Sequence, residues 1–318
     1  MNAVNAPVKI LLDCDTGIDD AITLLYLASL VKAGEAELVA VGTVHGNVAP
    51  DVGALNSLRV LERAGLPDVP VAVGAVRPMA QDVDYAHDWH GTDGLGETGL
   101  PEPAGRPVDI SAPEQIIRLG RERPGELTLL AVGPLTNLAI ALLLEPSLPT
   151  LFRDVVIMGG AFDHQGNVTS HAEANIWHDP EAAELVLGAG WPITLVPLDA
   201  THPTAVDGAW LDRLAEADSD LARFAARILK FYAIAYTRSL GTRGAVIHDA
   251  LAAMLAVDPS LGEYAERPVR VELRGERTRG TTLWDRRSYA DEGDRPVVRV
   301  AVGSDVAAFQ DRLLASLL

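Results

Sequence analysis

Lysine is the residue that this sequence most clearly lacks. The 318 residues contain only Lys9, Lys32 and Lys230, and lysine and arginine together number 26 against 44 acidic residues, so that the formal net charge is −18. Nucleic-acid backbones and anionic lipid surfaces repel a chain of this charge. We therefore expect neither nucleic acid nor a membrane to be a partner.

Cysteine is scarcer still, because Cys14 is the only one. A single cysteine excludes an intrachain disulfide and a zinc site built on several thiolates. The first ten residues show no signal peptide, and the longest apolar runs, such as Leu138 to Leu144, are too short to span a bilayer. These absences predict a cytoplasmic protein.

What the sequence does have is a regular alternation of strand and helix patterns. Six apolar runs with strand character precede residue 200 and are separated by helical patterns: Val8 to Leu12, Glu37 to Val44, Val71 to Gly74, Leu127 to Val132, Asp154 to Met158 and Trp191 to Leu198. Such alternation is typical of a parallel sheet. Later, residues 207–217 and 221–240 look helical, 268–273 and 296–300 look like strands, and Ser304 begins a terminal helix. We predict an α/β fold in one domain of residues 1–318, with a largely parallel central sheet covered by helices on both faces and extra helices toward the C-terminus.

Four acids stand where the first strand passes into the first helix: Asp13, Asp15, Asp19 and Asp20. Carboxylates this close repel one another and raise each other's pKa values, and a divalent cation relieves the repulsion. Their hard oxygen ligands favour Ca2+ or Mg2+. Helix capping explains Asp19 or Asp20 but not the two acids at the strand end. The cluster therefore favours a metal site over caps alone.

Other polar groups also follow strands or begin helices. They include His45-Gly46-Asn47, the long segment 77–110 with Asp88 to Leu95, Asp199 to His202, and His248-Asp249. A loop as long as 77–110 within a compact domain is usually functional or mobile. Ligands of parallel sheets bind beyond the carboxyl ends of the strands, so we expect these groups to converge on one rim.

Five of these segments, in order between residues 8 and 257, resemble the motifs of the nucleoside hydrolases, the inosine-uridine-preferring ribohydrolase family. The matching segments are Asp13 to Asp20 as the family's D-x-D-x-x-x-D-D signature, Val44 to Asn47, Val132 to Asn137, Asn167 to Asn175, and His248-Asp249. One D-x-D would be weak support, whereas five motifs in register are specific.

The resemblance implies a Ca2+-dependent enzyme that splits ribonucleosides into ribose and base. Asp15, Asp20, the backbone carbonyl of Val132 and Asp249 would hold the Ca2+, together with the 2′- and 3′-hydroxyls of the ribose. Asp15 would act as the general base, taking a proton from the water that attacks C1′. Asp13 would orient the acids around it. The family forms homodimers and homotetramers, and we expect one of these here.

The same resemblance assigns the ribose contacts to Asp19, Asn47, Asn167, Glu173 and Asn175. Recognition of every hydroxyl predicts strong discrimination against deoxyribose, because a buried polar group left without its partner is costly. Base preference stays open, since the loops that would close over the base are where family members diverge.

His248 is the candidate acid for the departing base, since imidazole ordinarily titrates near neutrality. Its neighbour Asp249 is a predicted metal ligand, which favours this role over that of a structural histidine. His90 matches a position near the base, the alternative being a loop histidine that packs on Trp89. Tyr232 and Tyr236, one helical turn apart, could face the base but fit a core stripe better.

Two other functions remain as alternatives. Haloacid-dehalogenase-type phosphatases also begin with a strand and D-x-D, but they expect Thr or Val where this chain has Gly17, and a later lysine where it offers only Lys230. A non-catalytic protein that binds ribose or Ca2+ could keep the fold without turnover. The presence of both Asp15 and His248 argues against it.

Overall fold

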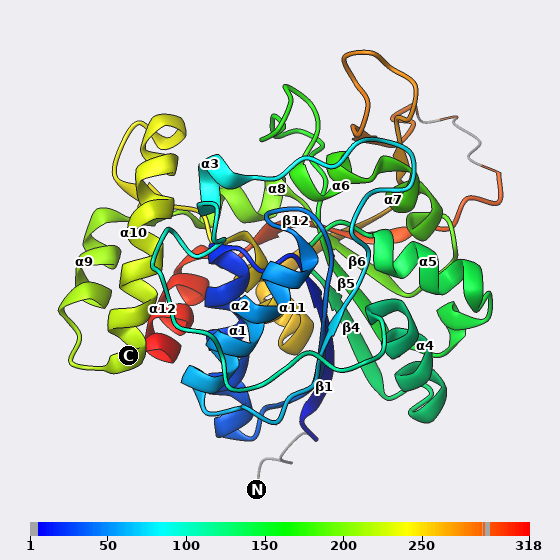
Figure 1. The fold of residues 1–318 in the computed structure, drawn as a ribbon. Coiled ribbons are helices and arrows are strands. Elements are labelled where there is room, and N and C mark those ends of the chain that lie inside the picture. Colours follow the sequence, from blue (N-terminus) through cyan, green and yellow to red (C-terminus); the bar gives the residue numbers. More distant parts are fainter. Residues whose placement is uncertain (1–5, 288, 290–292) are drawn as a thin grey trace, which may run out of the picture.

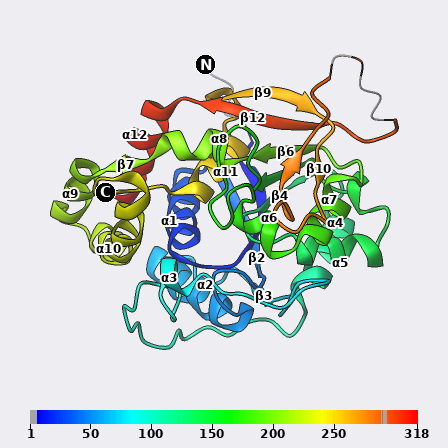
Figure 2. The same ribbon diagram turned by 90° about the horizontal axis from the view of Figure 1, so that it is seen from above.

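The structure is a computed structural model that describes residues 6–287, 289 and 293–318. Its centre is an eight-stranded sheet in the order β3-β2-β1-β4-β5-β6-β12-β9 (Figures 1 and 2). The strands are β1 (Val8–Cys14), β2 (Ala36–Thr43), β3 (Val71–Val73), β4 (Leu127–Ala131), β5 (Asp154–Met158), β6 (Ile193–Val196), β9 (Gly262–Arg267) and β12 (Val298–Ser304). Every neighbouring pair is parallel except β12 and β9. The predicted largely parallel sheet is confirmed.

Helices cover both faces of this sheet because side chains of the central strands alternate between two cores. In β1, Ile10 and Leu12 belong to one hydrophobic cluster and Leu11 to the other, and all three are buried. The first cluster is covered by α1 (Ile18–Ala33), α2 (Pro50–Ala64), α11 (His248–Val257) and α12 (Val306–Leu317), and the second by α4 (Ala112–Glu122), α5 (Thr136–Leu144) and α7 (Pro180–Leu187). Figure 1 shows the two sets of helices on opposite sides of the strands.

The extra helices predicted toward the C-terminus are α9 (Gly208–Glu216) and α10 (Asp220–Leu240). They pack together beside α12 at one end of the molecule (Figure 1). Ser219 caps the start of α10 through its side chain, and Gly241 ends the helix with a φ of 67°. The short helix α3 (His87–His90), part of the predicted long loop, packs against α10.

The late strands differ from the prediction. The expected strand at 268–273 is only β10 (Arg270–Val271), which pairs with β11 (Thr282–Leu283) in a separate ribbon. The sheet instead ends in β9, whose sequence Gly262–Arg267 is too polar to read as a buried strand. Because β9 is an edge strand, its side chains are only partly buried, and the apolar pattern of a central strand is not required.

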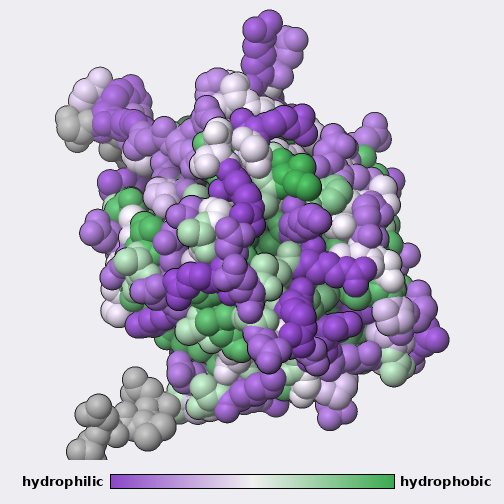
Figure 3. Space-filling view, turned by 90° about the vertical axis from the view of Figure 1, so that its left-hand side faces the viewer, coloured by the Kyte–Doolittle hydropathy of each residue, from purple (hydrophilic) through white to green (hydrophobic). Residues whose placement is uncertain are grey.

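The remaining short elements connect the larger ones. They are α6 (Ala174–His178), α8 (Leu198–Thr201), the 3-10 helices at Leu148–Thr150, His202–Thr204 and Pro259–Leu261, and the pair β7 (Val206–Asp207) and β8 (Gly244–Ala245). On the face shown in Figure 3, hydrophilic side chains predominate and hydrophobic ones gather in small patches. Across the described residues, we find no helix whose length and apolar character would let it cross a membrane.

Candidate active site

The predicted rim contains a cavity of about 230 Å³, a size suited to a small molecule. It lies beyond the carboxyl ends of the strands, as expected for a parallel sheet. Nine of the predicted site residues line it: Asp19, Asn47, His90, Val132, Asn167, Glu173, Asn175, His248 and Asp249. Asp13, Asp15 and Asp20 are buried and do not line it. Residues that are 230 positions apart in the sequence thus converge on one pocket.

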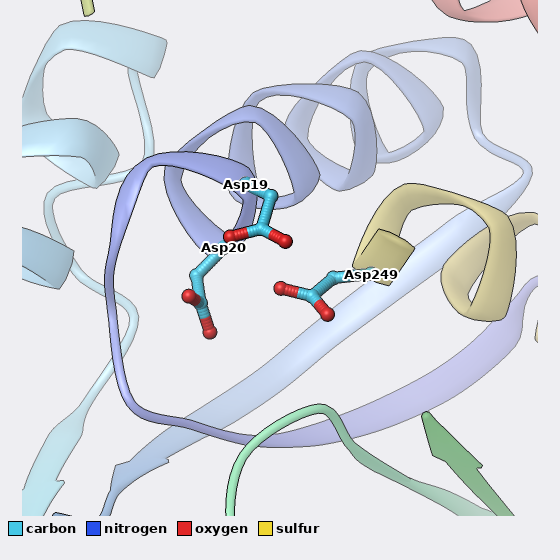
Figure 4. Close-up of side chains that lie close together, drawn as sticks. All are labelled: Asp19, Asp20 and Asp249. Atoms are coloured by element: carbon cyan, nitrogen blue, oxygen red, sulfur yellow. The ribbon is translucent and has the colours of Figure 1, made fainter. Parts of the chain in front are cut away.

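Three carboxylates lie close together at this cavity, two of them in its lining and the third, Asp20, buried next to them. Asp19 and Asp20 come from the first turn of α1 and Asp249 from the first turn of α11, and Figure 4 shows their side chains pointing toward one another. One oxygen from each lies within 4.8 Å of the others. All three side chains are buried, so the repulsion between them is weakly screened by water.

Asp15 lies against this group, at the end of β1. Its Oδ2 accepts a hydrogen bond of 2.7 Å from the backbone N–H of Asn47, and its own backbone N–H donates to Oδ1 of Asp20 at 3.3 Å. Glycines make the room that its carboxylate occupies. A Cβ on Gly46 would lie 2.0 Å from Oδ2 of Asp15, and one on Gly133 would lie 3.2 Å from Cγ.

Burial raises the pKa values of these acids, and neighbouring carboxylates add to the rise at Asp15, Asp19 and Asp249. Desolvation is the larger cause for each, and it raises the pKa of Asp19 to about 8 and that of Asp20 to about 6. The pKa values of Asp15 and Asp249 rise well above their ordinary range, again through burial first and neighbouring carboxylates second. Each of these groups is more costly to ionise here than in water.

These residues fit a divalent cation. The Oδ1 atoms of Asp15 and Asp19 are buried and have no hydrogen-bond partner, although buried carboxylate oxygens are normally paired. A hard cation among such oxygens would satisfy them and offset the repulsion. The donor set is entirely oxygen, which suits Ca2+ or Mg2+ rather than a thiolate-loving metal.

Asp13 lies behind the cluster and points to the other side of β1. Its Oδ1 accepts a 2.8 Å hydrogen bond from Nδ2 of Asn137, while burial raises its pKa to about 7. Asn137 also donates to the carbonyl of Thr43 and accepts from the N–H of Ala75. The amide therefore ties together the ends of β1, β2 and β3, a role that the sequence motif alone did not reveal.

The predicted ribose contacts come from three strand ends. Asn47 follows β2, and its Nδ2 donates to Oδ2 of Asp20 at 3.1 Å. Glu173 caps α6, because its two oxygens accept backbone hydrogen bonds from Gly160, Asn175 and Ile176. Burial raises the pKa of Glu173 to about 7.

Asn175 and Asn167 belong to the same loop and helix as Glu173. The Nδ2 of Asn175 donates to the carbonyl oxygens of Val132 and Met158, at 2.8 and 3.1 Å. Val132 and Asn175 both line the cavity, and the ligand role of the Val132 carbonyl stays a prediction. Asn167 accepts a hydrogen bond from the N–H of Ala174, which fixes the end of the loop over α6.

His248 is held at both ring nitrogens. Nδ1 lies 2.7 Å from Oγ1 of Thr201, and Nε2 lies 2.6 Å from the hydroxyl of Tyr236. Burial lowers its pKa to about 3, well below the near-neutral value of an ordinary imidazole. A neutral imidazole in this chain can still donate one hydrogen bond while accepting another.

His90 is tied to the start of α1. Its Nδ1 accepts a 2.9 Å hydrogen bond from the backbone N–H of Ile18, which places the ring proton on Nε2. Burial lowers its pKa to about 3, so the ring is neutral. Its ring packs on Tyr232, with 5.1 Å between centroids, whereas Trp89 packs on Tyr236. The ring contact of His90 is thus with Tyr232, and its place near the base stays a prediction.

Several cavity residues were not assigned from the sequence. Tyr232 and Tyr236 are buried, as a core stripe requires, but both also line the cavity. His164 and His202 line it as well, with ring centroids 4.3 Å apart. Helical spacing identifies a buried face but cannot tell a packed core from the wall of a pocket.

Comparison with known proteins identifies the family. The family model for inosine-uridine preferring nucleoside hydrolases matches residues 10–311. The probable uridine nucleosidase 2 of Arabidopsis thaliana is 37% identical, over 99% of this chain and 100% of its own length. The inosine-uridine preferring nucleoside hydrolase of Crithidia fasciculata is 36% identical, over 98% of each chain. A solved plant nucleoside hydrolase is 35% identical with a TM-score of 0.93, and the match covers 98% of this chain and 99% of the other.

The match runs through the whole sheet and through all five motifs around the cavity. The buried acids at this cavity agree with the metal dependence of such enzymes. The chain belongs to the inosine-uridine preferring nucleoside hydrolase family and is a ribonucleoside N-ribosyl hydrolase.

Proposed function

We propose that this protein hydrolyses the N-glycosidic bond of inosine- and uridine-type ribonucleosides in a Ca2+-dependent reaction. The carrying observation is the group of buried carboxylates at a small cavity, with unpartnered oxygens on Asp15 and Asp19. The named relatives include a uridine nucleosidase and an inosine-uridine preferring hydrolase, which supports this pair of substrates. We also propose that the protein is cytoplasmic and forms a homodimer or a homotetramer.

Asp15, Asp20, Asp249 and the carbonyl of Val132 would hold the cation. The structure groups Asp19 rather than Asp15 most tightly with Asp20 and Asp249. We keep Asp15 in the set because its Oδ1 is unpartnered and its pKa responds to Asp20. When bound, Ca2+ lowers the pKa of nearby water and binds vicinal hydroxyls.

Asp15 is the proposed general base. Its carboxylate accepts a hydrogen bond from the N–H of Asn47 and lies against Gly46 and Gly133, where a side chain would crowd it. A water beside its free Oδ1 would give up a proton to it while attacking C1′ of the ribose. The sugar hydroxyls would be held during this step by Asp19, Asn47, Asn167, Glu173 and Asn175. The family motifs imply these residues and their roles.

His248 is proposed to assist departure of the base, acting with Tyr236. If Thr201 donates to Nδ1 of His248 and Nε2–H donates to the oxygen of Tyr236, the Tyr236 hydroxyl proton is free to point into the cavity. A donor there would disperse the negative charge that develops on the leaving base. His90, with its proton on Nε2, would be a further donor near the base.

The test is release of free ribose from inosine and uridine, measured with Ca2+ and after treatment with a chelator. We expect activity that the chelator abolishes and that added Ca2+ restores better than Mg2+. A phosphatase of the haloacid-dehalogenase type would release phosphate from nucleotides and no ribose. A non-catalytic binding protein would bind ribosides without releasing anything, and either result would overturn the proposal.

A further inference from the structure

Asp199 makes a set of contacts that the reaction proposed above does not use. It lies in the first turn of α8, just after β6. Its Oδ2 accepts a hydrogen bond from the backbone N–H of Phe162 at 2.9 Å, and its Oδ1 accepts two more from Asp163 and His164 at 2.7 and 3.0 Å. One carboxylate therefore binds three consecutive amides of the loop between β5 and α6, residues 159–173, which we call the β5–α6 loop.

This loop forms one wall of the cavity. Five consecutive residues, His164 to Val168, line it, and they include the proposed ribose contact Asn167. Beyond the Asp199 contacts, the ring of His164 packs on that of His202, which follows α8 in the chain. The position of the wall is thus set largely from the short segment Asp199–His202.

The loop has little apolar burial of its own to hold it. Asp163, Gln165, Asn167 and Val168 are exposed, and Phe162 is only partly buried. A segment with few buried apolar contacts opens easily, so its hydrogen bonds decide which conformation it keeps. Hydrogen bonds to a charged acceptor are about twice as strong as neutral ones. The Asp199 carboxylate is well suited to fix this backbone.

Other contacts hold the two ends of the loop and link residues within its second half, where the N–H groups of Gly166 and Val168 donate to the carbonyls of Ser170 and Ala172. Thr282 exchanges hydrogen bonds with the backbone N–H and carbonyl of Ala161, and Trp284 packs on Phe162 with 4.7 Å between ring centroids. Asn167 is bonded to Ala174 at the far end. Asp199 is the group that binds the backbone at His164, where the cavity wall begins.

We propose that Asp199 is a positioning residue for substrate binding: it holds the β5–α6 loop in the conformation that completes the cavity. This inference rests on the proposed function, because the ligand whose binding it predicts is a ribonucleoside. It acts on affinity rather than on the bond-breaking step, since Asp199 touches neither the acid cluster nor His248. Without the carboxylate, the loop samples open conformations, and substrate must close it at the expense of binding free energy.

The kinetic test compares Asp199→Ala and the isosteric Asp199→Asn with Asp163→Asn as the matched control. Asp163 lies in the same loop, and its exposed carboxylate pairs with Arg286 and takes no part in the hydrogen bonds to Asp199. For inosine and uridine, we expect Asp199→Ala to raise KM on the order of tenfold to a hundredfold while kcat changes less than about threefold. Asp199→Asn, which keeps one acceptor, should fall between it and wild type. The control should match wild type.

A second measurement does not depend on turnover. In the wild-type protein, amide hydrogen exchange should be slow at Asp163 and His164, and Asp199→Ala should accelerate it there without changing exchange in β1 or α11. A loss confined to kcat, an unchanged KM, or fast exchange at these amides in the wild type would overturn the inference. If the wild type releases no ribose at all, the proposed function fails, while the hydrogen-exchange measurement still tests whether Asp199 holds the β5–α6 loop.

Discussion

Asp249→Asn should stabilise the protein in the presence of a chelator and remove its response to calcium. The Asp249 side chain is buried, and its pKa is raised by burial first and then by Asp19, Asp20 and Asp15. A neutral amide of the same shape removes one charge from this group and leaves its volume unchanged. A substitution that removes a proposed metal ligand would thus help the metal-free fold, which is the opposite of the usual effect of a buried mutation.

Coulomb repulsion gives the size of this effect. Two unit charges 4.8 Å apart, the upper limit for the grouped oxygens of the three acids, repel by about 3 kcal/mol at an effective dielectric constant of 20. For 318 residues the entropy of unfolding is about 0.7 kcal/mol/K, so that 3 kcal/mol shifts Tm by about 4 to 5 °C.

The sign of the pH dependence follows from the raised pKa values. These acids have folded-state pKa values above their unfolded values, so they favour folding fully below about pH 4, and that contribution is lost as pH rises through about 6 to 8. Wild-type protein in chelator should therefore lose stability between pH 5 and pH 8. Ca2+ should restore it, and the gain should be larger at pH 8.

The assay is thermal unfolding at pH 5 and pH 8, in chelator and in Ca2+. Asp68→Asn serves as the control, because it makes the same change in net charge at an exposed position. We expect Asp249→Asn to raise Tm in chelator at pH 8 and to show little shift with Ca2+, while the control behaves as wild type. A lower Tm for Asp249→Asn in chelator, or a full Ca2+ response, would refute the reasoning.

Three further changes test other parts of the site. Asp15→Ala should reduce turnover of inosine and uridine by several orders of magnitude while circular dichroism shows a folded protein; near-normal turnover would remove Asp15 as the base. His248→Ala and Tyr236→Phe should each slow inosine hydrolysis more than hydrolysis of an activated aryl riboside that needs no proton, whereas equal losses would argue against a role in base departure. Asn137→Ala should lower the free energy of unfolding by about 3 kcal/mol, because three hydrogen bonds, two of them buried, are lost and Oδ1 of Asp13 is left without its partner. Chemical denaturation measures this, and a loss below about 1 kcal/mol would contradict the structural role.

The sheet could be predicted because its strands carry the signal in their own side chains. Val8–Cys14 and Leu127–Ala131 are nearly all apolar, since both faces of each strand are covered. The edge strand β9 escaped prediction because one side of Gly262–Arg267 has no neighbouring strand and little cover. Its place in the sheet depends on pairing with β12, a contact that no local pattern records.

The candidate site was predictable where a motif lies at a strand end. Four charged residues in an apolar setting, Asp13, Asp15, Asp19 and Asp20, are evident in the sequence. The structure places Asp19 and Asp20 in one group of carboxylates and Asp15 beside that group. The environment of His248 could not be foreseen. Its low pKa depends on burial among α10, α8 and α11, whose packing is a property of the whole fold.

The role of Asp199 also could not be predicted from the sequence. In the sequence it is one acid after a strand, indistinguishable from a helix cap. Only the path of the β5–α6 loop reveals that three amides converge on it.

The close approach of Gly46 and Gly133 to Asp15 has a practical consequence for protein engineering. Gly46 and Gly133 contribute nothing chemical, yet a single methyl group on either would have to displace the carboxylate or the backbone next to it. Gly46→Ala, whose methyl group would lie 2.0 Å from Oδ2 of Asp15, would thus provide an inactive reference enzyme that retains every acid, amide and imidazole of the pocket. Libraries that seek a new base preference should vary the β5–α6 loop and the face of α10 that lines the cavity, and hold these two glycines constant.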